Sequence, residues 1–165
     1  MENQTDQFVG TWIIKEWTVT NLSTNEVIPF FGGNFSGQII YTADGWVSAS
    51  LMEKNRPDVS NDRDRRYHIH SKLKADGLAT LSEEALDFLS PYTLSALGYV
   101  GYMGTYDTDE ELVNHHVQSA SRPNHVGITL PRYYRFDDNL LYLHADAFGW
   151  RDSLVWEKAN DTDGQ

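Results

Sequence analysis

The sequence predicts an all-β fold, an eight-stranded antiparallel up-and-down β-barrel with a short helical insertion. Most of the chain consists of short segments in which apolar and polar residues alternate, as in strands with one buried face. Turn-forming residues separate these segments, so neighbours in sequence are expected to pair as hairpins. A meander of eight strands must protect its two edges, and closure into a barrel does so. A two-sheet sandwich is the alternative architecture.

The expected strands cover residues 9–20, 36–42, 46–52, 99–107, 112–120, 129–136, 140–145 and 153–158. The second and third are joined by Ala43-Asp44-Gly45, and Asp-Gly is a strong hairpin signal because a type I′ turn requires positive φ. The length of 165 residues suits one domain. We therefore expect a single barrel domain over residues 1–165, in which residues 8–158 form the barrel and residues 159–165 an acidic tail.

Two segments interrupt the meander. Residues 53–75 are highly charged and are interpreted as a solvated loop. Residues 80–97 are predicted to be helical, because Thr80 and Glu83 fit a capping box and apolar residues recur on one face. Pro91 predicts a break just before it, since proline is unfavourable deep inside a continuous helix. We hypothesise that this helical segment covers one mouth of the barrel.

Charge and composition restrict the classes of partner. Lys and Arg total 13 against 24 Asp and Glu, so the net charge is −11. An acidic surface repels phosphate backbones and anionic membranes, so neither a nucleic acid nor a membrane is an expected partner. The chain contains no cysteine, which excludes disulfides and thiolate metal sites. No nucleotide, flavin or haem motif is present, and we expect no cofactor.

The first seven residues are polar and acidic and lack the apolar core of a signal peptide. We therefore expect a cytoplasmic location. The sequence leaves the oligomeric state open, a homodimer included.

Several short motifs follow one another along the chain. They are Phe8-Val9-Gly10-Thr11-Trp12 and the segments 37–49, 102–106, 113–117, 123–127 and 154–158. As an ordered set they resemble the lipocalin-like domain family of bacteria and fungi. The resemblance implies a lipocalin-like barrel and, by analogy with related barrels, the binding, isomerisation or cyclisation of a lipophilic molecule. The chain departs from the family pattern at His125, where an aromatic residue is usual, and at Lys158, where an arginine is usual.

These observations favour a protein that binds a small, mostly hydrophobic molecule inside the barrel. Aromatic residues make up 13% of the chain and suit the lining of such a pocket, although strands are rich in aromatic residues for packing reasons alone. The alternative is a cofactor-independent enzyme, an isomerase, lyase or cyclase that acts on a lipophilic secondary metabolite by acid/base catalysis.

Three residues are candidates for such chemistry. If Trp12 points into the barrel, alternation places Glu16 on the same face, where an apolar cavity would raise the pKa of its carboxyl group. The other interpretation of Glu16 is a solvated or ion-paired residue at the mouth. His115 lies on the more apolar face of its strand and is expected to point inward, unlike His116, either for proton transfer or to bond a strand neighbour. Tyr106 is the candidate hydrogen-bond donor to an oxyanion.

Aromatic, apolar and basic residues on the expected strands are candidates to line the interior. They are Trp12, Ile14, Tyr41, Trp46, Tyr102, Tyr133 and Arg132. An inward arginine would favour a ligand with a carboxylate or an enolate, whereas an outward one belongs to a solvated face. His68 and His70 have a spacing that can chelate a metal from a strand. No third ligand lies near them in sequence, so no metal site is expected.

Overall fold

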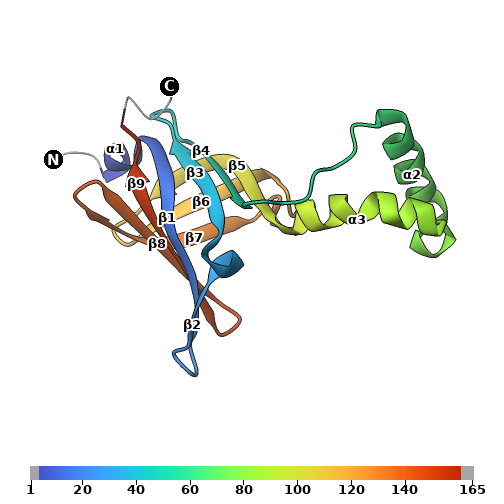
Figure 1. Cartoon of the computed structure of the whole chain (residues 1–165). Coiled ribbons are helices and arrows are strands. Elements are labelled where there is room, and N and C mark those ends of the chain that lie inside the picture. Colours follow the sequence, from blue (N-terminus) through green and yellow to red (C-terminus); the bar gives the residue numbers. More distant parts are fainter. Residues whose placement is uncertain (1–3, 161–165) are drawn as a thin grey trace. The chain divides into compact units, whose positions relative to one another are not determined.

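The structure is a computed structural model that describes residues 4–160. Its strands are β1 (Gly10–Asn21), β2 (Val27–Pro29), β3 (Phe35–Tyr41), β4 (Trp46–Glu53), β5 (Tyr99–Thr108), β6 (Leu112–Ala120), β7 (Thr129–Asp137), β8 (Leu140–Ala147) and β9 (Trp150–Lys158). They form one antiparallel sheet in the order β2-β1-β3-β4-β5-β6-β7-β8-β9, and pairing of β1 with β9 closes it (Figure 1). The predicted eight-stranded barrel is confirmed, with β2 as a short additional strand beside β1.

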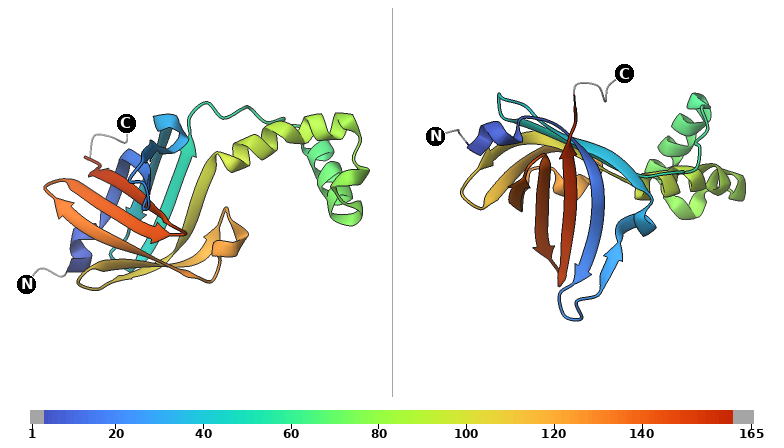
Figure 2. Two further views of the ribbon diagram at one scale, coloured as in Figure 1. Left: turned by 90° about the horizontal axis from the view of Figure 1, so that it is seen from below. Right: turned by 60° about the vertical axis from the view of Figure 1, so that its left-hand side comes forward.

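Helices flank the strands or lie between β4 and β5. They are α1 (Gln4–Phe8), η1 (Phe30–Gly33), α2 (Arg63–Asp76), η2 (Leu78–Thr80), α3 (Glu83–Leu97) and η3 (Pro123–His125). The strands curve around a common interior, and α1 lies at the end of the barrel where β1 begins and β9 finishes (Figure 2).

Aromatic side chains fill this end of the barrel. Phe8 is fully buried, and its ring centroid lies 5.1 Å from that of Tyr41 and 4.9 Å from those of Tyr134 and Phe136. Trp12 is buried beside it and donates its Nε1 hydrogen to the carbonyl oxygen of Phe8 at 2.7 Å. These contacts bury large apolar rings and satisfy the indole donor, so α1 is held firmly against the barrel.

The Gly-x-Trp motif at the start of β1 has a structural role. Gly10 has φ +131°, and a Cβ atom there would lie 3.2 Å from Cε of Lys158. The Nζ atom of Lys158 lies 5.1 Å from the centroid of the Trp12 ring, within reach of a cation–π interaction. Glycine therefore makes room for the lysine that occupies the place where the resemblance implies an arginine.

The opposite end of the barrel is less densely filled. The rings of Tyr41 on β3 and Tyr106 on β5 contact Phe8 at the α1 end. Near the other end of the same two strands, Phe35 and Val100 are only half-buried. Four half-buried apolar side chains pack against the core toward this opposite end: Phe30, Phe31, Phe35 and Val100. These side chains keep part of their surface exposed.

A bulge in β1 changes which residues face the interior. Trp12 and Ile14 are buried, but the register with β9 shifts between Ile14 and Glu16. Beyond the shift Trp17 is buried and Glu16 is exposed. The prediction that Glu16 points into the barrel is therefore wrong, because a bulge reverses the alternation of all residues that follow it.

The described residues divide into two compact units, one that contains the barrel and one that consists of residues 55–98. No helix among the described residues is long and apolar enough to cross a membrane. The predicted acidic tail lies outside the described residues from position 161 onward.

The interpretation of residues 53–75 as a loop is wrong in their second half, which forms α2. Asp62 is the N-cap of this helix, and its side chain accepts a hydrogen bond from the backbone N–H of Arg65 at 2.9 Å. Five of its fourteen residues are Arg or Lys, which have high helix propensity. Capping and propensity thus outweigh the absence of an apolar stripe.

The helix α3 begins later than predicted. Ser82, and not Thr80, is its N-cap and accepts a hydrogen bond from the backbone N–H of Ala85 at 3.2 Å. The helix continues through Pro91, so the predicted break is wrong. Pro91 removes one backbone N–H from the helix, and this local cost does not end the helix.

Candidate functional site

A buried histidine occupies the barrel interior. His115 lies on β6 between Val113 and Val117, which share its face, and its exposed fraction is 0%. Strand alternation places these three side chains inside and leaves His116 on the outer face. His116 instead bonds Asp107 across the outer face, with 2.7 Å between Nε2 and Oδ2.

Both ring nitrogens of His115 bond tyrosines from other strands. Its Nε2 lies 2.8 Å from Oη of Tyr41 on β3, and its Nδ1 lies 2.8 Å from Oη of Tyr102 on β5. Tyr41 is buried and touches Phe8 at the filled end, whereas Tyr102 is half-buried and precedes Tyr106 by four residues on β5. The three residues, which we call the His115 trio, therefore run from the filled end toward the less filled end.

Arg132 lies on β7, next to the strand that carries His115. It is half-buried, and it shares the inner face with Tyr134 and stands opposite Val113 of β6. Its guanidinium donates one hydrogen bond, to the carbonyl oxygen of Pro131 at 2.9 Å. Among the described residues no carboxylate lies within ion-pair distance of it. An inward cation without a carboxylate partner is a candidate anion-binding group.

Burial keeps the His115 trio neutral. Burial, with a smaller effect of the Arg132 charge, lowers the pKa of His115 from 6.5 to about 3. Burial also raises the pKa values of Tyr41 and Tyr102 above their ordinary value of 10.0. Near neutral pH the trio is therefore an uncharged hydrogen-bonded network beside one cation.

The other two candidates for acid/base chemistry, Glu16 and Tyr106, are not part of the His115 trio. Glu16 is exposed on the outer face after the bulge in β1. Tyr106 is buried, and its hydroxyl donates to the carbonyl oxygen of Thr42 at 3.1 Å. Burial raises the pKa of Tyr106, so its phenol stays protonated and donates its hydrogen to the backbone of the β3–β4 turn.

The candidate lining residues fall into two groups. Four point inward, as expected: Trp12, Ile14, Tyr41 and Tyr102. Arg132 also lies on an inner face, which is one of the two orientations that the sequence left open. Trp46 and Tyr133 are 39% and 45% exposed and point outward, because Val47 and Tyr134 occupy the inner faces of their strands. Tyr133 stacks on His144 with 5.0 Å between ring centroids. The prediction that Trp46 and Tyr133 line the interior is therefore wrong.

Two interior features were missed by sequence reasoning. The bulge turns Trp17 inward, where it stacks on Phe30 with 4.1 Å between ring centroids. Trp156 is buried, and its Nε1 donor has no partner among the described residues. The adjacent pair Phe30-Phe31 was a signal for an apolar partner nearby, whereas nothing in the sequence indicates an unpaired indole.

Histidine pairs do not form a metal site. His68 and His70 lie on α2, where residues two apart point in different directions. The described residues contain no group of three His, Cys, Asp or Glu side chains that could hold a metal ion.

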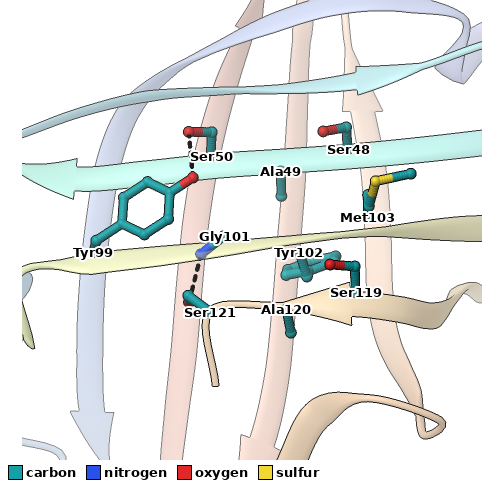
Figure 3. A pocket seen from close by; sticks show the side chains of 10 residues that line it. All are labelled: Ser48, Ala49, Ser50, Tyr99, Gly101, Tyr102, Met103, Ser119, Ala120 and Ser121. Atoms are coloured by element: carbon teal, nitrogen blue, oxygen red, sulfur yellow. Dashed lines mark hydrogen bonds between the residues drawn. The ribbon is translucent and has the colours of Figure 1, made fainter. Parts of the chain in front are cut away.

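A shallow groove of about 340 Å³ lies on the outer face of β4, β5 and β6 (Figure 3). Two hydrogen bonds join residues of its lining: Ser50 Oγ lies 3.1 Å from Tyr99 Oη, and Gly101 donates its N–H to Ser121 Oγ at 3.0 Å. The Tyr99 ring covers Gly101, where a Cβ atom would lie 2.5 Å from the phenol oxygen. Tyr102 also borders this groove, but its ring points to the inner face of the barrel, where it bonds His115.

The fold defines the class of protein: a closed antiparallel β-barrel with one filled end and polar groups on its inner face. A family profile described as the lipocalin-like domain matches residues 9–85 and 89–160. The chain belongs to the lipocalin-like domain family, which confirms the resemblance. A crystal structure of a mutant of the fluorescent protein UnaG is similar over 94% of this chain and 99% of that chain, at 10% identity and a TM-score of 0.40. No curated protein matches the sequence.

Proposed function

We propose that the protein binds a small, mostly apolar molecule with an anionic end inside the barrel. The observation that carries the proposal is Arg132, an inward and half-buried cation without a carboxylate partner among the described residues, beside a neutral His–Tyr network. Partly desolvating a charge is unfavourable unless an opposite charge compensates it. A ligand carboxylate supplies that compensation and accepts hydrogen bonds from the guanidinium.

The apolar part of the ligand has matching surroundings. Phe30, Phe31, Phe35 and Val100 pack against the core and keep part of their surface exposed. Burial of such surface by an apolar ligand contributes about 25 cal/mol per Å². The expected ligand is therefore amphipathic, with its carboxylate at Arg132 and its hydrocarbon part against the aromatic side chains.

The alternative prediction is a cofactor-independent isomerase, lyase or cyclase, and its two candidate bases are poorly suited to that role. An efficient general base has a pKa near the working pH. Burial lowers the pKa of His115 to about 3, and Glu16 is on the outer face. These features favour binding over catalysis. A cytoplasmic location and a homodimer stay predictions.

A fluorescence titration tests the proposal. The probe is 11-(dansylamino)undecanoic acid at pH 7.5, with its methyl ester as the neutral counterpart. We expect energy transfer from tryptophan to the dansyl group that saturates at one probe per chain. Arg132→Gln should weaken binding of the acid by about tenfold while it affects the ester little, because only the acid carries the compensating charge.

Arg135→Gln is the matched control. Arg135 lies three residues further along β7 on the outer face, where it donates to Asp137 at 3.0 Å and covers the Tyr142 ring. Its loss should leave both affinities unchanged. Absence of saturable binding by either probe, or equal losses in the two arginine variants, would contradict the proposal. Mass spectrometry of the bound and released probe also reports whether the protein converts it.

A further inference from the structure

We propose that the hydrogens of the His115 trio are ordered in one direction and leave the Tyr102 hydroxyl as a donor for the ligand. In this order Tyr41 donates to Nε2 of His115, and Nδ1–H of His115 donates to Oη of Tyr102. The Tyr102 hydroxyl hydrogen then points away from His115. This inference rests on the proposed function and names Tyr102 as a specificity-determining residue for a carboxylate.

The first step follows from the chemistry of a neutral imidazole. Such a ring has one N–H donor and one acceptor nitrogen. Both nitrogens of His115 lie 2.8 Å from a tyrosine oxygen. One tyrosine therefore donates to the ring, and the other accepts from it. The fully buried position of His115 keeps the ring in this neutral form.

The second step decides which tyrosine donates. Tyr41 is 1% exposed, and His115 Nε2 is the partner of its hydroxyl among the described residues. If Nε2 carried the proton, the Tyr41 hydrogen would have no acceptor in the core, which is strongly unfavourable. Tyr41 therefore donates to Nε2, and the imidazole proton resides on Nδ1.

The third step gives the consequence for Tyr102. It accepts from Nδ1–H, so its own hydrogen needs another acceptor. Tyr102 is half-buried, and its hydroxyl bonds no other residue described in the structure. Arg132 pairs with Val113, which precedes His115 by two residues on the same inner face of β6, so the trio and the guanidinium belong to the same part of the interior. A carboxylate has two oxygens and can accept from the hydroxyl and the guanidinium together.

The order also strengthens the free donor. Each group in a chain of hydrogen bonds polarises the next, so a hydroxyl that accepts a bond becomes a better donor. The buried Tyr41 and His115 thus act as positioning residues that fix the direction of the Tyr102 hydrogen. The tautomer of His115 is the feature that sets ligand preference.

The closing experiment has an arm that needs no ligand. Nitrogen-15 NMR of the ligand-free protein at pH 7.5 separates the protonated from the bare imidazole nitrogen, with His115 assigned through its backbone so that no variant is required. We expect the proton on Nδ1. A proton on Nε2, or two protonated nitrogens, overturns the ordering whatever the protein binds.

The second arm measures the ligand preference with the same acid and ester probes. Tyr102→Phe should lower the affinity for the acid probe by about tenfold relative to the affinity for the ester. Tyr99→Phe is the control, because that hydroxyl lies in the outer groove three residues away on β5. Equal affinities of Tyr102→Phe and wild type for the acid overturn the role of Tyr102. Failure of both probes to bind wild type contradicts the proposed function, while the NMR result still decides the ordering.

Discussion

At the scale of single residues, the neutral state of His115 makes the stability of the protein depend on pH. Burial lowers the pKa of His115 to about 3 in the folded protein, against an ordinary value of 6.5. The unfolded chain therefore binds more protons than the folded one between pH 6.5 and pH 3. Stability is complete above about pH 6.5 and falls as the pH decreases through this window.

We expect the free energy of unfolding to decrease by about 2 kcal/mol between pH 7 and pH 5 because of His115. Urea unfolding of wild type and His115→Gln, measured at both pH values, isolates this contribution as the difference in slope with pH. His70→Gln is the control, because His70 is exposed on α2 and is not desolvated in the folded protein. Equal pH slopes in wild type and His115→Gln would show that His115 is protonated inside the barrel.

Trp12 and Trp156 are both buried but differ in their hydrogen bonds. Trp12 donates to the carbonyl oxygen of Phe8, whereas the Trp156 donor has no partner among the described residues. Replacement by phenylalanine removes similar apolar area at either site. We therefore expect Trp12→Phe to lower the free energy of unfolding by about 1 kcal/mol more than Trp156→Phe, as measured by urea titration. The reverse order would indicate that a bound molecule satisfies the Trp156 donor.

Sequence alternation was sufficient to place several site residues. The sequence analysis expected His115 on the inner face and named Tyr41, Tyr102 and Arg132 as candidates to line it. The structure joins the first three by hydrogen bonds and places Arg132 on the neighbouring strand. Glu16 was misplaced, because a single extra residue in a strand leaves no clear mark in the sequence. The bonds of the trio join strands far apart in the chain, so alternation alone could not predict them.

At the scale of structural elements, the turn between β8 and β9 contains an unfavourable residue. Ala147 pairs with Trp150, so Phe148 and Gly149 form the loop, with φ values of +52° and +82°. Positive φ at both positions is typical of a type I′ turn, which favours Asn-Gly. Phe148 is 101% exposed and gains no burial from this position.

Phe148→Asn should therefore raise the free energy of unfolding by roughly 0.5–1 kcal/mol, which is about 1–4 °C in Tm for a domain of this size. Thermal unfolding followed by circular dichroism measures this shift. Phe148→Ala is the control, since alanine also disfavours positive φ and should give little gain. Equal stabilisation by both variants would mean that the exposed ring, and not the backbone conformation, is unfavourable.

Strands and helices differed in how well local patterns predicted them. Hairpins such as β3–β4 were clear from alternation and from Asp44-Gly45, because both strands face a single core. The helix α2 was missed, because its stability derives from capping by Asp62 and from propensity, and not from an apolar face. Short polar helices carry little periodic signal, so composition alone made this segment resemble a loop.

At the scale of the whole molecule, the barrel closes through contacts that do not involve residues 55–98. The main core cluster consists only of residues outside this segment. Met52 of β4 pairs directly with Tyr99 of β5, so the two ends of the inserted segment are adjacent in the sheet. A barrel domain that folds without the insertion, and a helical segment that covers its mouth, are two separate predictions.

Replacement of residues 55–98 by Gly-Gly tests both. The new link leaves a short hairpin loop between β4 and β5. Closing a shorter loop costs less entropy, which should favour the folded variant by roughly 2 kcal/mol and offset the contacts that are lost. We expect cooperative unfolding by urea with a stability equal to or above that of wild type. Insertion of Gly-Gly after Asp138, in the loop between β7 and β8, is the control for a changed hairpin. A barrel that fails to fold would make residues 55–98 an integral part of the domain.

If the folded variant releases the dansyl acid probe at least about tenfold faster than wild type, the segment slows ligand exit, as a cover over the mouth requires. An unchanged release rate would contradict that role and leave the barrel alone responsible for holding the ligand.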